Sequence, residues 1–187
     1  MSQADIPAYV KDAAQLLSDN GFATSDVWYH GTSSGLLASI KEKGLNRSGD
    51  RESNQSIKNT MATIGNSYTE SVQPVFLTQS KQLAYYWAAQ KARFRTQRMG
   101  QEEEPVILEV KLDEKLKEKV RPDAGGAALI ISRDAYIDYI NVVFEENGVA
   151  IGELDPMKMD GKACLAKLGL AYLDTNIPAE SITLVSE

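Results

Sequence analysis

The sequence is poor in the side chains that most often bind metal ions or form cross-links. Among 187 residues it holds one cysteine, Cys164, and one histidine, His30. An internal disulfide is therefore impossible, and a structural zinc site is not expected, because such a site takes four Cys or His ligands. Cys164 lies in K-A-C-L-A-K-L, which is typical of a buried helical position, so a nucleophilic Cys-His pair is disfavoured.

Long apolar runs and an excess of basic charge are also missing. No segment approaches the length of a membrane-spanning helix, and the N-terminus lacks the pattern of a signal peptide, so we expect a cytoplasmic protein. The net charge is −6, whereas nucleic-acid-binding proteins are more often basic. This argues against a large phosphate-binding surface but leaves room for a local patch at Arg93, Arg95 and Arg98.

The composition that remains is that of an ordinary soluble protein. Hydrophobic residues make up 43% and charged residues 25%, and the length predicts a single domain over 1–187. Residues 1–22 are expected to form an N-terminal helical extension. Within it a helix at 5–19 would begin near Asp5 and Pro7 and end at Asn20 and Gly21.

Short strands and helices then alternate without a regular order, which predicts an α+β fold with a mostly antiparallel sheet. The expected strands are 27–29, 75–78, 106–112, 127–132, 170–175 and 181–185. The expected helices are 34–43, 80–96, a turn within 114–119 and 160–168, while 135–144 fits either state. Residues 46–73 are polar and weakly periodic, which predicts a long functional loop with at most one helical turn near 56–63.

The only histidine ends an apolar strand in V-W-Y-H-G-T-S-S, directly before a small polar turn. Gly31 would let a ligand approach the backbone closely. The His30 imidazole could hydrogen-bond a ribose hydroxyl, and Thr32 and Ser33 add hydroxyl groups. Spacing alone favours the plainer alternative, in which His30 bonds local backbone at an ordinary turn.

A second candidate feature is aromatic. The strand V-F-L-T carries Phe76, and the helix that follows carries Tyr85, Tyr86 and Trp87. Two aromatic side chains from different elements can sandwich a planar ring. For an isolated aromatic stripe, packing in the core is the more common explanation.

Taken in order, three motifs resemble the ADP-ribosyltransferase superfamily in its diphtheria-toxin-like, His-Tyr-Glu branch. They are Y-H-G-T-S-S-x-x-L-x-S-I-x-x-x-G-L, V-F-L-T-x-S-K-x-x-A-Y-Y-W-A and P-V-I-L-E-V-K-L, which span about 27–112, and the ending G-L-A-Y-L-D-T-N-I-P-A-E-S-I is similar to that fold's last strands. The resemblance implies a split antiparallel β-sandwich with flanking helices. It also implies an enzyme that uses NAD as co-substrate and breaks the nicotinamide–ribose bond. A single ADP-ribose unit would then pass to a protein or nucleic-acid acceptor.

The resemblance assigns roles to residues of the first motif. His30 would hold the ribose and the nicotinamide side of NAD, and the backbone of Gly31 would bind the carboxamide. Thr32 would contact the nicotinamide or the ribose. Arg47, with Arg51 as the alternative, would reach the ADP half.

In the second motif, Phe76 stands where the family has a tyrosine, which keeps the stacking face and loses a hydroxyl. Tyr86 would stack on nicotinamide, with Tyr85 as its neighbour and alternative. His30 and Tyr86 are therefore the expected catalytic residues. No metal is expected.

The third family residue, a glutamate that opens a late strand, falls near Leu170, where this chain has no acid. Glu146 and Glu153 are weak substitutes. Family members without the glutamate transfer a single unit, use another acid or lack activity, so a non-catalytic module that binds NAD or a partner is the alternative. An RNA 2′-phosphotransferase is a further one, although the extra arginines and basic N-terminal region it needs are not found. Compact enzymes of this kind are often bacterial or phage toxins, effectors or defence components, and a toxin would have a neutralising partner protein.

Overall fold

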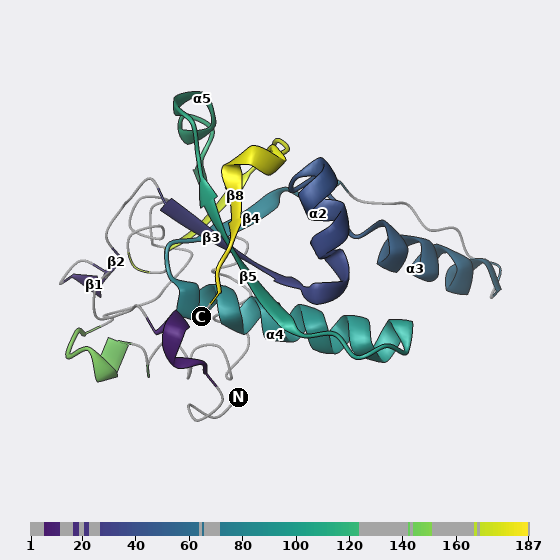
Figure 1. Ribbon diagram of the computed structural model, residues 1–187, viewed down its shortest axis with the longest axis horizontal. Helices are drawn as coiled ribbons and strands as arrows, with labels where there is room; N and C mark the ends of the chain where they lie inside the picture. Colours follow the sequence, from purple (N-terminus) through teal and green to yellow (C-terminus); the bar gives the residue numbers. More distant parts are fainter. Residues whose placement is uncertain are drawn as a thin grey trace.

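The fold is seen in a computed structural model of the chain (Figure 1). It describes residues 6–11, 17–18, 21–22, 27–63, 65, 72–123, 142, 144–150, 167 and 169–186. The expected strand at 127–132, most of 135–144, most of the helix at 160–168 with Cys164, and Glu153 lie outside the described residues.

Six of the described strands form one antiparallel sheet in the order β6-β7-β4-β3-β5-β8. They are β3 (Val27–Ser33), β4 (Val75–Thr78), β5 (Pro105–Lys111), β6 (Arg121–Pro122), β7 (Leu170–Leu173) and β8 (Ile182–Leu184). Together with the helices this confirms the α+β class. Five of these strands coincide with predicted ones, and β6 was not predicted.

The sheet is divided along the line between β3 and β4. β3 pairs with β5 along its whole length, from Val27 to Ser33. It pairs with β4 only through Tyr29 and Thr78. Two three-stranded halves, β6-β7-β4 and β3-β5-β8, therefore meet at one residue pair and separate beyond it, which opens space inside the sheet.

Helix α4 (Lys81–Met99) runs along one face of the sheet against β3 and β5 (Figure 1). The Ser80 hydroxyl caps it by accepting a hydrogen bond from the Leu83 N–H at 3.3 Å. Gly100 ends it in the left-handed conformation, where glycine carries no steric cost. This confirms the helix expected at 80–96.

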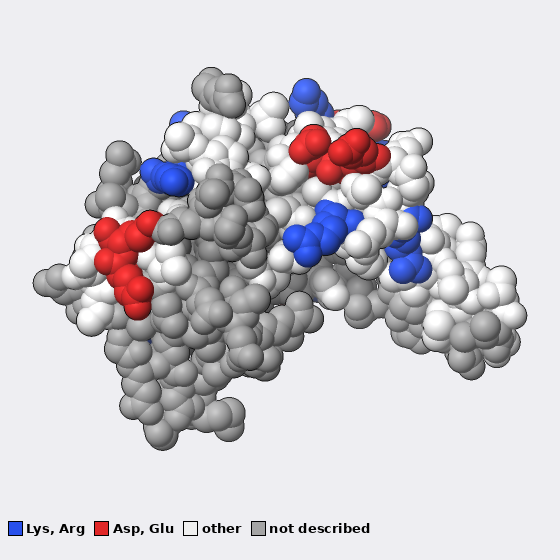
Figure 2. Space-filling model, turned by 90° about the horizontal axis from the view of Figure 1, so that it is seen from below, with Lys and Arg blue, Asp and Glu red and all other residues white. Residues whose placement is uncertain are grey.

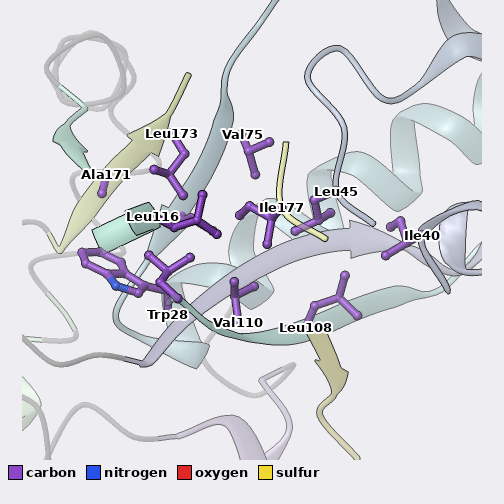
Figure 3. Packing of buried hydrophobic residues seen from close by; sticks show 12 residues of the cluster. Trp28, Ile40, Leu45, Val75, Leu108, Val110, Leu116, Ala171, Leu173 and Ile177 are labelled. Carbon is purple, nitrogen blue, oxygen red and sulfur yellow. The ribbon is translucent and has the colours of Figure 1, made fainter. Parts of the chain in front are cut away.

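A hydrophobic cluster lies on the other face of the sheet. Figure 3 shows side chains of β3, β4, β5 and β7 gathered there, including Trp28, Val75, Val110 and Leu173. The same face is covered by α2 (Leu37–Lys43), α5 (Glu114–Lys117) and the segment around Ile177. Short 3-10 turns, η3 (Ser34–Leu36) and η4 (Ala179–Ser181), precede α2 and β8.

The long loop expected at 46–73 is wrong, because α3 (Arg51–Thr63) occupies half of it; the helical turn expected near 56–63 lies within this longer helix. Its apolar face is too weak to reveal a helix by periodicity. The helix is instead fixed at its start, where the Asp50 carboxylate accepts hydrogen bonds from the Ser53 N–H at 3.1 Å and hydroxyl at 2.8 Å. A side chain at this position satisfies an N–H group that has no partner within the helix.

The helical extension expected at 1–22 is also wrong where the structure describes it. Only a 3-10 turn, η2 (Ala8–Val10), is present, and β1 (Leu17–Ser18) pairs with β2 (Gly21–Phe22). The run Ser-Asp-Asn at 18–20 disfavours a helix interior, since these side chains compete for backbone hydrogen bonds. No helix in the described part of the chain is long and apolar enough to cross a membrane.

Candidate functional site

A pocket of about 970 Å³ lies where β3 and β4 separate. His30, Gly31 and Thr32 of β3 and Phe76 of β4 line it. Other lining residues come from α2 and the segment after it on one side and from α4 on the other. The volume is at the upper end of that of small-molecule sites, which suits a ligand of dinucleotide size.

His30 bridges the gap between the two halves of the sheet. Its Nδ1 lies 2.8 Å from the carbonyl oxygen of Phe76. A carbonyl can only accept, so Nδ1 carries the proton in this hydrogen bond and Nε2 of the neutral ring is left as an acceptor. Burial is the main cause that lowers the pKa of His30, and the charge of Lys91 lowers it further. The hydrogen bond to the Phe76 carbonyl raises the pKa, but the net value stays below the usual one. The imidazole is therefore neutral at pH 7.

The backbone of Gly31 faces the pocket. Gly31 pairs with Ile107 on β5, whose carbonyl oxygen accepts from the Val185 N–H beyond β8 and so points away from β3. In an antiparallel ladder the two residues of such a pair direct their backbone groups outward. The N–H and C=O of Gly31 thus point toward β4, which has already diverged, and offer a donor and an acceptor side by side.

The lack of a side chain at Gly31 has a second cause. A Cβ atom there would lie 2.0 Å from the Ala84 carbonyl oxygen and 2.7 Å from the Ala88 nitrogen of α4. Both obstacles are helix backbone, so no rotamer change relieves them. Gly31 is therefore required for α4 to pack on β3, whatever the pocket binds.

Of the hydroxyl residues that follow, Thr32 lines the pocket as expected, whereas Ser33 and Ser34 bind other parts of the chain. Thr32 is buried and lines the pocket. Ser33 donates to the Glu103 carboxylate, and Ser34 accepts from the Glu104 N–H at 2.9 Å. Neither serine caps a helix with its side chain, so these contacts instead anchor the turn after β3 to the segment before β5.

Of the predicted aromatic residues, the structure brings Phe76 to the pocket but not Tyr86. Phe76 is 43% exposed and lines the pocket. Tyr86 is buried, 7% exposed, and packs edge-on against Trp87 with ring centroids 5.3 Å apart. Trp87 and Phe94 line the pocket from α4, whereas Tyr85 does not. Sequence spacing could not choose among three consecutive aromatic residues.

Arg47 lies outside the pocket. Its Nη2 pairs with Asp174 at 2.5 Å, and it lines a separate hollow together with Arg51 and Lys58. The next residue back, Asn46, does line the pocket. The expected contact of Arg47 with a bound ADP group would therefore take place at the edge of the site.

The three arginines at 93–98 do not form one free basic patch. Arg95 is 2% exposed in its side chain and pairs with Asp50 at 2.5 Å, Glu52 at 2.8 Å and Glu103 at 2.8 Å. Burial alone lowers the pKa of Arg95, but the three carboxylates outweigh it and hold the group charged. Figure 2 shows basic and acidic side chains adjacent on the face seen from below.

Two acids line the pocket within the described chain, Asp50 and Asp123. Asp50 is bound by Lys91 at 2.5 Å as well as by Arg95. Its burial raises the pKa, but Lys91 and Ser53 more than reverse this and leave the pKa lowered. Asp123 directly follows β6 and is 8% exposed. Sequence reasoning missed it, because a lone Pro-Asp step carries no signal until β6 pairs with β7.

The other expected acids are elsewhere. Leu170 is buried at the start of β7 and carries no acid. Glu146 is exposed and does not line the pocket. No group of three His, Cys, Asp or Glu side chains suited to a metal ion occurs within the described ranges.

No family model, curated protein or solved structure matches the chain.

Proposed function

We propose that this chain is an NAD-dependent mono-ADP-ribosyltransferase. It would break the nicotinamide–ribose bond and transfer ADP-ribose to a macromolecular acceptor. The observation that supports this best is that His30, Gly31 and Thr32 line one pocket with Phe76, which is far from them in sequence. These are the positions that the motif resemblance assigns to NAD.

The groups in the pocket fit the nicotinamide half of NAD chemically. A carboxamide has one C=O and one NH₂, which match the N–H and C=O of Gly31. His30 Nε2 is an acceptor suited to a ribose hydroxyl. The rings of Phe76 and Trp87 line the same space and provide apolar faces for a planar ring.

These contacts act mainly by positioning. Cleavage of a glycosidic bond passes through a transition state that resembles an oxocarbenium ion. A ligand held at both the carboxamide and the ribose has its C1′–nitrogen bond fixed in place, which lowers the entropic cost of reaching that state. His30 stays neutral, so it adds no positive charge where a cation develops.

The position of α3 supports a macromolecular acceptor. Gly49 and Asp50 line the pocket, and the mostly exposed, polar helix α3 begins at the next residue. An acceptor that lies on this helix would reach the pocket opening. A protein acceptor suits the net charge of −6 better than a nucleic acid does.

The test is release of nicotinamide from NAD, measured together with NAD binding by calorimetry. We expect the wild type to bind NAD and release nicotinamide, and His30→Ala to lose the release. Lys41→Ala, an exposed change on α2, is the control for handling and folding. A folded wild type that neither binds NAD nor releases nicotinamide would refute the proposal.

The positions of Leu170 and Tyr86 favour one alternative, a non-catalytic module that binds NAD. With Leu170 at the start of β7, that strand has no acid there. With Tyr86 buried elsewhere, the pocket lacks the expected tyrosine. NAD binding without nicotinamide release, with all acceptors tried, would support that alternative. The phosphotransferase alternative gains nothing, since Arg95 is occupied by three carboxylates.

A further inference from the structure

An enzyme of the proposed kind needs a carboxylate near the reacting sugar. It stabilises the developing cation or takes the proton of the acceptor. Leu170 cannot do this. The carboxylate would have to come from another element that places one at the same end of the sheet.

The pairing of β6 with β7 does so. Arg121 lies opposite Tyr172 and Pro122 opposite Ala171. Asp123 is the next residue, and its N–H donates to the Leu170 carbonyl oxygen at 3.1 Å. Asp123 is therefore tied to the backbone at Leu170, on the neighbouring strand.

Asp123 lines the same pocket as His30 and Phe76. It is 8% exposed and lines the space at the split in the sheet. β7 carries no acid there, but its Leu170 pairs with Thr78 of β4. Backbone pairing therefore links Asp123, through Leu170, to the strand that carries Phe76. The backbone of Asp123 is therefore fixed to β7, which itself pairs with β4.

The other acid of the pocket has a different task. Asp50 caps α3 and is held by Lys91 and Arg95 at 2.5 Å each. Its two oxygens accept from both cations and from Ser53. Moving it toward a substrate would break the start of α3 and leave Arg95 with one fewer partner.

We propose that Asp123 is the catalytic carboxylate, taking the place that Leu170 leaves empty; this inference rests on the proposed function. In the reaction, the C1′–nitrogen bond of NAD breaks and its electron pair leaves with neutral nicotinamide. A bond forms between C1′ and an oxygen or nitrogen of the acceptor. The acceptor's proton passes to the Asp123 carboxylate and then to water, so one proton is released for each ADP-ribose transferred.

The experiment compares the rate of nicotinamide release in wild type, Asp123→Asn and Asp123→Glu, with water or a guanidino compound as acceptor. We expect Asp123→Asn to lower the rate about 100-fold or more, the range removed with a general base, while NAD binding measured by calorimetry is retained. Asp123→Glu keeps a carboxylate and should recover part of the rate. Glu118→Gln, an exposed acid five residues earlier, is the matched control.

The outcomes separate this inference from the proposed function. If wild type releases nicotinamide and Asp123→Asn releases it equally fast, the role of Asp123 is refuted and the function stands. If Asp123→Asn fails to fold, Asp123→Ser, which also lacks the carboxylate, takes its place: an unchanged NAD affinity with a reduced rate supports the role, and an unchanged rate refutes it. If wild type binds NAD without release, the proposed function itself fails, and the inference with it.

Discussion

At the scale of single residues, Gly31 is the position that the structure constrains most tightly. A Cβ atom there would meet the backbone of α4 at 2.0 Å and 2.7 Å, so Gly31→Ala must push the helix away from β3. We expect a loss of about 1–3 kcal/mol or more in the free energy of unfolding, measured in urea. The graded control is Gly49→Ala, whose new carbon would meet only the Asn46 carbonyl oxygen, at 2.9 Å. Equal losses in the two variants would contradict this account of Gly31.

His30 makes a second prediction, which concerns pH. Its pKa in the folded protein lies below the ordinary value of 6.5, mainly because of burial. As pH falls below 6.5, the unfolded chain therefore binds more protons than the folded one, and stability falls. Above pH 6.5 this contribution is fully present. The slope from His30 is at most about 1.4 kcal/mol per pH unit.

The measurement is the free energy of unfolding from pH 7.5 to pH 5.5 in wild type and in His30→Gln. Since the chain has one histidine, the difference between the two curves isolates its titration, while the carboxylates cancel. We expect the curves to converge as pH falls. Curves that stay parallel throughout would show that the pKa of His30 is not lowered.

At the scale of elements, α3 is held to α4 by the ion pairs of Arg95 rather than by an apolar face. Removing Arg95 leaves the Glu103 carboxylate, 7% exposed, without its cation, and leaves Asp50, 11% exposed, with Lys91 alone. We expect Arg95→Ala to cost about 3–5 kcal/mol in unfolding free energy, as for other broken buried pairs. Glu52 is 70% exposed, so Glu52→Gln should cost less than about 1 kcal/mol. A small loss in Arg95→Ala, no larger than that in Glu52→Gln, would show that α3 is held in another way.

The same contrast explains which elements the sequence could predict. β3, β4, β5 and α4 carry closely spaced apolar residues, and this local signal predicted them. α3 has a local capping signal in Asp50 but few apolar residues at helical spacing, and the arginine that binds it lies 44 positions beyond Arg51, so the apolar pattern did not reveal it. The site residues differ in the same way. Those on predicted strands were found through the motifs. Trp87 and Asp123 line the pocket because of the helix face and the strand end on which they lie, and local sequence does not show either.

At the scale of the whole molecule, the pocket lies between two halves of a sheet that share one residue pair. A ligand that contacts β3, β4 and the end of β6 would join these halves. It would also stabilise the fold by mass action, by about 2.7 kcal/mol when its concentration is 100 times its dissociation constant. Binding at this place therefore has both a local and a global readout.

Tryptophan fluorescence gives the local readout, because the chain has two tryptophans in different places. Trp87 lines the pocket, whereas Trp28 is 4% exposed in the core cluster. We expect NAD to quench the fluorescence of the wild type and to raise its melting temperature. Trp87→Phe keeps an aromatic ring, so it should lose most of the quenching and retain binding by calorimetry. ADP-ribose, which lacks the nicotinamide ring, should quench less than NAD at equal saturation. Quenching that persists in Trp87→Phe, or that ADP-ribose reproduces in full, would place the nicotinamide away from Trp87 and from this end of the pocket.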